Sequence, residues 1–289
     1  MTADPVLEKA PILEELEVVG TLSPSRASDF KTCPLLYRFR TIDQLPEPPS
    51  PEAVRGTLVH AVLERLYDLP AAERTPEAAE GLIESSWLEI QAAEPEIAEL
   101  FKDSAAAEAD WLGSVRPILA GYFALEDPTR LAPSARELFV EVLLPTGLRL
   151  RGFVDRLDEA PTGELRVVDY KTGKAPGANY ESKALFQLKF YALVIWRTHG
   201  RVPRELRLLY LADREVLRYT PHEAELRAFE RQLEALWRAI DRARVTRDWR
   251  PSPGPLCNWC AHQAICPAYG GTPPPLPEET PVAEVPASA

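Results

Sequence analysis

The chain has 289 residues, of which 45% are hydrophobic, with a formal net charge of −11 and four cysteines. This length can bury a substantial core in one large domain. No apolar run approaches the roughly 20 residues of a membrane span, and the N-terminus lacks the basic start and apolar core of a signal peptide. We therefore expect a cytoplasmic protein that does not cross a membrane.

The acidic residues are concentrated at the two ends of the chain. Residues 1–20 carry five acids and one lysine, and residues 272–289 carry three acids and no base. We interpret residues 1–20 as a flexible acidic lead and residues 271–289 as a disordered, proline-rich acidic tail. A strongly acidic protein is an unfavourable partner for a polyanion, but the predicted domain between these ends, 21–270, is much closer to neutral.

Two helices are predicted early in the domain. Ser23 or Ser25 is a suitable N-cap for the first, in a basic, aromatic segment that contains Cys33. Pro51 opens the second, and His60 lies on it one turn after Gly56. A histidine on such a face is more often a packed core residue. It becomes a candidate ligand only when other ligands are found.

Residues 73–126 predict two or three further helices, rich in Ala and Glu and without recognisable chemistry. We expect them to form a helical insertion beside the functional cleft. Residues 136–145 then alternate as a strand, with Glu137 and Glu141 on the same side. Glu141 could approach a metal site, although a solvated strand face is the better interpretation.

Residues 150–173, LRGFVDRLDEAPTGELRVVDYKTG, predict two strands joined by a turn at 161–163. Alternation places Asp155 on the first strand, and Asp169 and Lys171 on one face of the second, in otherwise apolar surroundings. Two carboxylates in one small volume repel each other unless a cation lies between them, and Mg²⁺ or Mn²⁺ suits such oxygen ligands. A nearby ammonium group can orient water or offset charge on a phosphate. An ordinary hairpin with solvent-exposed ion pairs is the simpler alternative.

The segment after this hairpin, ESKALFQLKFYALVIWRTHG, predicts a buried helix, because apolar residues cover nearly all of it. Gln187 and Tyr191 lie in its middle, one turn apart. A buried glutamine without a partner costs about 1 to 3 kcal/mol, so Gln187 is expected to face a polar cleft. A second hairpin that turns near Asp213 and a long amphipathic helix over 221–248 follow.

Three of the four cysteines are close together near the end of the domain, as C-x₂-C-x₅-C, and the fourth lies far upstream. Disulfides are not expected in the cytosol, so an ion or a cluster is the expected partner. Four thiolates suit either structural Zn²⁺ or a [4Fe–4S] cluster, and His262 would be a spare zinc ligand. The four are Cys33, Cys257, Cys260 and Cys266.

The order of the sequence motifs along the chain is also informative. The segments GTLVH (56–60), GFVDRLD with DYKTG (152–173) and QLKFY (187–191) lie between the first cysteine and the other three. Over residues 21–270 this arrangement resembles the PD-(D/E)XK nuclease superfamily, specifically its RecB-type exonuclease branch with a C-terminal iron–sulfur module, as in AddB-like and CRISPR-adaptation nucleases. The resemblance implies an α/β fold with a restriction-endonuclease-like core. Its central mixed sheet would be flanked by helices, with a helical insertion at about 73–126 and a four-cysteine module at about 251–270.

The resemblance also implies the roles of individual residues. The implied ligands of Mg²⁺ or Mn²⁺ are His60, Asp155, Asp169 and the backbone carbonyl of Tyr170. Lys171 would orient or activate the attacking water, with Asp155 and Asp169 as its catalytic partners. Gln187 and Tyr191 would contact substrate or the metal-site residues. The implied ligands of a [4Fe–4S] cluster, in preference to Zn²⁺, are Cys33, Cys257, Cys260 and Cys266.

The implied activity is metal-dependent hydrolysis of DNA, by an exonuclease that acts on single strands in repair, recombination or CRISPR-type processing. The chain lacks G-x-x-x-x-G-K-[ST], so strand separation would need a helicase or repair partner. Two other functions remain open. One is a catalytically inactive nucleic-acid-binding or scaffold protein of the same fold, and the other is a zinc-stapled phosphoesterase.

Overall fold

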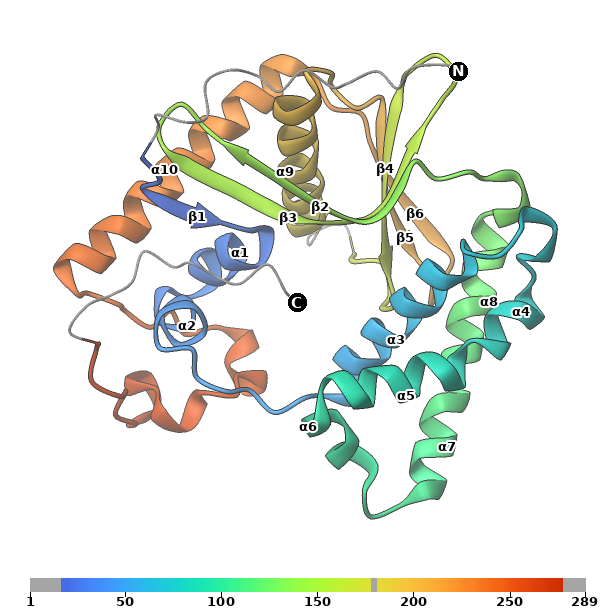
Figure 1. Ribbon diagram of the computed structural model, residues 1–289. Helices are drawn as coiled ribbons and strands as arrows, with labels where there is room; N and C mark the ends of the chain where they lie inside the picture. The colour runs from blue at the N-terminus through green and yellow to red at the C-terminus, as the bar shows by residue number, and fades with distance from the viewer. Residues whose placement is uncertain (1–16, 178–180, 278–289) are drawn as a thin grey trace.

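A mixed sheet of six strands forms the centre of the protein, with helices on both faces (Figure 1). The computed structural model describes residues 17–177 and 181–277, so the expected acidic lead up to residue 16 and the tail from residue 278 lie outside the described residues. The strands are β1 (Gly20–Leu22), β2 (Ala135–Leu143), β3 (Leu148–Glu159), β4 (Leu165–Lys171), β5 (Glu205–Tyr210) and β6 (Glu215–Tyr219). The predicted α/β fold with a central mixed sheet is confirmed.

The two hairpins expected from sequence are β3 with β4 and β5 with β6, both antiparallel. Strands β4 and β5 are parallel and are joined through helix α9 (Glu181–His199), which is the predicted buried helix. The strand at β1 was not predicted. It pairs in parallel with β3, and Gly20 is required there because a Cβ atom would lie 1.8 Å from the ring of Trp237.

One edge of β3 is divided between two neighbours. Strand β1 pairs with residues 148–150 and β4 pairs with residues 156–159, whereas β2 follows the opposite edge from 149 to 157. Residues 151–155 therefore have no strand partner on this edge within the described part of the chain. The sheet opens at this point, next to Asp155.

Helices cover the two faces of the sheet in two groups. They are α1 (Pro24–Thr32), α2 (Pro34–Tyr37), α3 (Pro51–Leu66), α4 (Pro76–Gly81), α5 (Ile83–Ala93), α6 (Pro95–Ala98), α7 (Ala105–Gly113), α8 (Val115–Leu125), α9 and α10 (Glu223–Thr246). Val167 of β4 packs with the core that includes α9 and α10, and its neighbour Val168 packs with the core that includes α3, α5 and α8. The alternation of a strand explains why adjacent valines enter different cores.

The predicted helical insertion is divided into more helices than expected, α4 to α8. Trp87, Trp111 and Tyr122 are buried in its core, and Phe123 is partly buried against the same core. Gly121 lets α8 approach the sheet closely, since a Cβ atom there would lie 1.9 Å from the carbonyl oxygen of Leu211. The insertion is thereby anchored directly against the end of β5.

The two ends of the described chain lie side by side, with α1 and α2 next to the short 3₁₀ turns at 255–269 (Figure 1). The backbone N–H of Ser252 donates to Cys33 Sγ at 3.4 Å, and His262 Nε2 lies 2.8 Å from Glu47. Residues 271–277, expected to begin a disordered tail, lie against this body instead. Arg38 donates to the carbonyl of Pro274, and Arg247 donates to that of Leu276.

Within the described ranges, we find no helix of both the length and the apolar character needed to cross a bilayer.

Candidate metal and active site

Asp155 lies where β3 and β4 separate. The last registered pair between these strands is Arg156 with Val168, and beyond it the Asp155 carboxylate accepts the backbone N–H of Tyr170 at 2.6 Å. Asp155 is only 9% exposed. Burial and the nearby charge of Asp169 raise the pKa of Asp155 well above its ordinary value. The strand geometry thus holds the Asp155 carboxylate in a buried position, where the ionised form is unfavourable without a neighbouring cation.

His60 reaches the same place from helix α3. Ser50 caps this helix by accepting the N–H of Ala53, and Pro51 occupies its first turn. Nδ1 of His60 lies 3.4 Å from Asp155 Oδ2, and Nε2 lies 3.0 Å from the carbonyl oxygen of Tyr170. Burial lowers the pKa of His60, which favours the neutral imidazole that metals bind. Three groups predicted from sequence therefore lie together.

Glu137 is a site residue that the sequence analysis missed. Its carboxylate, His60 and Asp155 each offer one ligand atom, all within 4.8 Å of one another. Burial and the charge of Asp155 raise the pKa of Glu137 to about 7. Glu141, considered from sequence, is instead 3.8 Å from Arg149 and 38% exposed in its side chain, in agreement with a solvated strand face.

The position of Glu137 depends on how β2 pairs with β3. The pairs on either side, Arg136 with Arg156 and Leu138 with Val154, leave Glu137 opposite Asp155. Its backbone has a φ of 42°, in the left-handed region. A non-glycine residue there is uncommon and often marks a functional position. The alternating acids of this strand were the only sequence signal, and they did not distinguish Glu137 from Glu141.

Asp169 and Lys171 form an ion pair beside these ligands, with 2.5 Å between Lys171 Nζ and Asp169 Oδ2. The other oxygen of Asp169 accepts from Gln187 Nε2 at 2.9 Å, and the same amide donates to the hydroxyl of Tyr191 at 3.4 Å. Gln187 and Tyr191, the two residues of α9 that were predicted to face the site, therefore contact it through Asp169. Burial lowers the pKa of Lys171, but the charge and hydrogen bond of Asp169 outweigh it, so the net shift is upward.

The donor atoms fit a hard divalent cation. The site offers the buried carboxylate of Asp155, the half-buried carboxylate of Glu137, a neutral imidazole and the carbonyl of Tyr170. These are oxygen and nitrogen ligands that Mg²⁺ and Mn²⁺ accept. The raised pKa values of Asp155 and Glu137 reflect first their burial and then the negative charge of the neighbouring carboxylates. A bound cation would remove this repulsion.

Comparison with known proteins is consistent with this geometry. The family model of the PD-(D/E)XK nuclease superfamily matches residues 21–267. The chain belongs to this superfamily. Members of the PD-(D/E)XK superfamily use divalent metals, in agreement with the donor set described above.

Individual relatives add less detail. The Gene 69 protein of Mycobacterium phage D29 is 28% identical over 198 residues, which cover 62% of this chain and 70% of the phage protein. The Gene 69 protein of Mycobacterium phage L5 is 29% identical over 126 residues, so the match spans 43% of this chain and only 41% of that relative. A crystal structure named “Putative exonuclease”, from Eubacterium rectale, has a TM-score of 0.56 at 14% identity and covers 84% of this chain and 88% of its own. It shares the fold.

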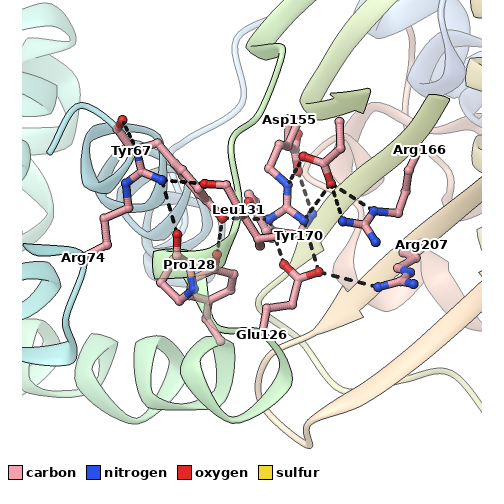
Figure 2. Close-up of polar contacts among 12 residues, drawn as sticks. Tyr67, Arg74, Glu126, Pro128, Leu131, Asp155, Arg166, Tyr170 and Arg207 are labelled. Carbon is pink, nitrogen blue, oxygen red and sulfur yellow. Dashed lines mark hydrogen bonds and ion pairs between the residues drawn. The ribbon is translucent and has the colours of Figure 1, made fainter. Parts of the chain in front are cut away.

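Figure 2 shows Tyr67, Glu126 and Tyr170, three partners of one buried arginine, in the same view as Asp155. The side chain of Arg156 is 0% exposed. Its guanidinium donates to both oxygens of Glu126 at 2.7 and 3.1 Å and to both oxygens of Asp158 at 3.0 and 3.2 Å. It also donates to the hydroxyls of Tyr67 and Tyr170, at 3.1 and 3.0 Å. Sequence analysis did not single out this residue.

The Arg156 network connects the helical insertion to the site. Glu126 follows α8 and Tyr67 ends α3, whereas Asp158 and Tyr170 belong to β3 and β4. Tyr170 is held by its hydroxyl here, and its carbonyl lies against His60. The network therefore positions the backbone between Asp169 and Lys171.

A cavity of about 1200 Å³ extends from Lys171, Gln187 and Tyr191 to the cysteine module. All four cysteines line it, together with His262. The four thiols are free, and no three of them lie within 4.8 Å of one another in the described part of the chain. Five cationic residues also line the cavity, whereas none of its described lining residues is Asp or Glu. The five are Arg26, Lys31, Arg151, Lys171 and Lys174.

Proposed function

We propose that this PD-(D/E)XK nuclease is a Mg²⁺- or Mn²⁺-dependent deoxyribonuclease that digests single-stranded DNA from an end. The observation that carries the proposal is the convergence of His60, Glu137 and Asp155 within 4.8 Å, beside the Asp169–Lys171 pair. Gene 69 relatives and the exonuclease-like fold are compatible with it but do not define the substrate.

The proposed roles of His60, Glu137 and Asp155 follow from the positions of their donor atoms, whereas Asp169 is added from the resemblance, since its oxygens contact Lys171 and Gln187. His60, Asp155, Asp169 and the carbonyl of Tyr170 are the proposed metal ligands, with Glu137 added to them. When bound, the cation would polarise the scissile phosphate and lower the pKa of a water molecule. Lys171 is expected to be protonated, because its pKa is raised. It therefore acts by orienting the water and offsetting negative charge on the phosphate, rather than by accepting a proton.

The cavity supports DNA as the substrate despite the net charge of −11. Cationic side chains attract the phosphate backbone, and five of them line the cavity without an acid among its described lining residues. The acids that adjoin this lining include Asp169, which pairs with Lys171, and a bound cation would offset the charge of the proposed ligands. A local cationic groove can therefore guide a polyanion towards Lys171.

Incubation of end-labelled DNA with purified protein tests the proposed function. We expect degradation of linear single-stranded DNA with Mn²⁺ or Mg²⁺, no degradation in EDTA, and resistance of a circular single strand of the same sequence. Cleavage of the circular strand would show that the protein is an endonuclease and not an exonuclease. Absence of cleavage, with DNA binding retained, would instead support a nucleic-acid-binding protein.

The stabilisation of the protein by Mn²⁺ should depend on pH. In the metal-free protein, Glu137 has a pKa raised to about 7, so its contribution to stability is present at low pH and is lost as pH rises through 7. Mn²⁺ competes with this proton, and a cation that binds the folded state stabilises it. The increase in melting temperature caused by Mn²⁺ should therefore be larger at pH 8 than at pH 6.

Glu137→Gln provides the matched control for this measurement. It removes one ligand charge and its titration, so the variant should show a smaller Mn²⁺ effect at pH 8 and less change between the two pH values. Equal Mn²⁺ effects at pH 6 and pH 8 in the wild-type protein would contradict the proposed ligand set.

We further propose that Cys33, Cys257, Cys260 and Cys266 hold a [4Fe–4S] cluster. The four thiols come from the two ends of the domain and line one cavity. Cys33 already contacts the cysteine module through Ser252, so a cluster would join α1 and α2 to that module. Because metal binding adds to folding free energy in sites of this kind, its expected role is structural.

The visible spectrum of anaerobically purified protein tests the cluster. We expect broad absorbance near about 400 nm and about four irons per protein. Cys260→Ser should lose both and melt at a lower temperature. A colourless preparation that contains one zinc per chain would replace the cluster with the zinc alternative.

A further inference from the structure

Two exposed phenylalanines lie opposite each other near the metal site. Phe139 of β2 and Phe153 of β3 are registered partners, with ring centroids 5.3 Å apart. They are 41% and 36% exposed, although neighbouring Val140 and Val154 are buried in the core. Each lies two residues from a proposed metal ligand, Glu137 or Asp155, which corresponds to about 7 Å along a strand.

The phenylalanine pair lines the same cavity as Lys171. Phe153 belongs to residues 151–155, the part of β3 that no described strand covers on one edge. Gly152 beside it lets the ring of Tyr191 pack closely against β3, because a Cβ atom there would lie 3.0 Å from that ring. Two exposed aromatic side chains thus lie where the sheet opens, next to the proposed site of cleavage.

Two arginines accompany the phenylalanine pair. Arg151 precedes Phe153 by two residues, so strand alternation places both on one face of β3, and Arg26 of α1 lines the same cavity. Nη1 of Arg26 is buried and makes no hydrogen bond to the described residues. Burial lowers the pKa of Arg26, and the like charge of Arg151 also lowers it. An anion between the two guanidinium groups would offset the cost of burying Arg26 and the repulsion between Arg26 and Arg151.

We propose that Phe139 and Phe153 stack an unpaired nucleobase of the substrate strand, while Arg26 and Arg151 hold its phosphate. This inference rests on the proposed nuclease function and assigns a cause to its preference for single strands. Aromatic side chains bind single strands by stacking on bases that are free of a duplex, and a paired base has both faces covered by its neighbours. The occupant is therefore one nucleotide of single-stranded DNA adjacent to the cleaved bond.

Two opposed phenylalanines could also serve only to stiffen the β2–β3 pair, since cross-strand aromatic pairs stabilise sheets. That role requires no base, no arginines and no position on the cavity. The two interpretations differ in one measurable property. Only the stacking site makes binding depend on the presence of bases in the DNA.

Binding measured by fluorescence anisotropy in EDTA separates stacking from stiffening without requiring cleavage. The probes are a labelled single-stranded oligonucleotide and the same strand with several adjacent abasic sites. We expect the wild-type protein to bind the normal strand about tenfold more tightly. The double variant Phe139→Leu with Phe153→Leu should lose most of this preference, and its Mn²⁺-induced increase in melting temperature should not change.

The arginines should act on both probes equally. Arg151→Met should weaken the binding of normal and abasic strands by a similar factor and reduce the salt dependence of both. Leu88→Ala, an exposed apolar position outside the cavity lining, and Arg218→Met, an exposed arginine on β6, are matched controls that should bind as wild type does.

The outcomes distinguish this inference from the nuclease proposal. Cleavage by wild type with equal binding of normal and abasic strands would overturn the stacking site and leave the nuclease intact. Base-dependent binding that the double phenylalanine variant loses, without any metal-dependent cleavage, would support the stacking site and reject the nuclease. Retention of the preference by the double variant would also overturn the inference.

Discussion

Replacing Lys171 or Asp169 with alanine is expected to lower the rate of metal-dependent DNA cleavage at least about 100-fold, the usual effect of removing one group that stabilises a transition state. The raised pKa of Lys171 keeps its ammonium group protonated, and Asp169 lies 2.5 Å from it. Initial rates on a labelled single strand with Mn²⁺ measure the effect. Undiminished cleavage by either variant would reject the assigned site.

The lower cleavage rate should arise from a slower chemical step rather than from unfolding or from weaker DNA binding. Lys171→Ala should retain the melting temperature of the wild type within a few degrees and the visible spectrum of the proposed cluster. Lys102→Ala removes another lysine that pairs with an acid, Glu99, at an exposed position of the helical insertion. Its cleavage rate should equal that of the wild type.

Arg156→Met is expected to destabilise the fold by about 3 to 5 kcal/mol, the usual cost of breaking a buried ion pair by removing one partner. The variant removes the fully buried cation that bonds both Glu126 and Asp158, and the remaining pairs, Arg207 with Glu126 and Arg166 with Asp158, are partly exposed. It also removes the donor to Tyr170. Urea denaturation of metal-free protein measures the change in the free energy of unfolding.

Arg166→Met is the matched control for Arg156→Met. Arg166 also pairs with Asp158, at 2.8 Å, but its side chain is 28% exposed. Partly solvated pairs contribute little, so the expected change is below about 1 kcal/mol. If the two variants lost the same stability, the Arg156 network would not be the structural link between the insertion and the sheet.

Much of the site could be predicted from sequence because it depends on local periodicity. Asp155, Asp169 and Lys171 lie on strands whose alternation is visible in 150–173, and Gln187 and Tyr191 lie one turn apart on a helix. The polar members of these apolar segments were therefore recognisable as candidates before any tertiary contact was known. His60 needed those partners before it could be interpreted as a ligand.

Other features depend on which segments become neighbours. Glu137 faces Asp155 only because β2 and β3 adopt one register, and a shift by one residue would turn it to the other face. Arg156 looks like an ordinary strand cation until Glu126 and Tyr67 reach it from the helices. The contacts of residues 271–277 likewise need Arg38 and Arg247 from distant segments.

The sequence by itself therefore determined most of the elements, the order of the candidate ligands and the superfamily resemblance, since side-chain periodicity is a property of each segment alone. Tertiary structure decided the third member of the ligand group, the buried arginine and the cationic cavity. These depend on strand register and on long-range packing, which bring together side chains that no local pattern relates.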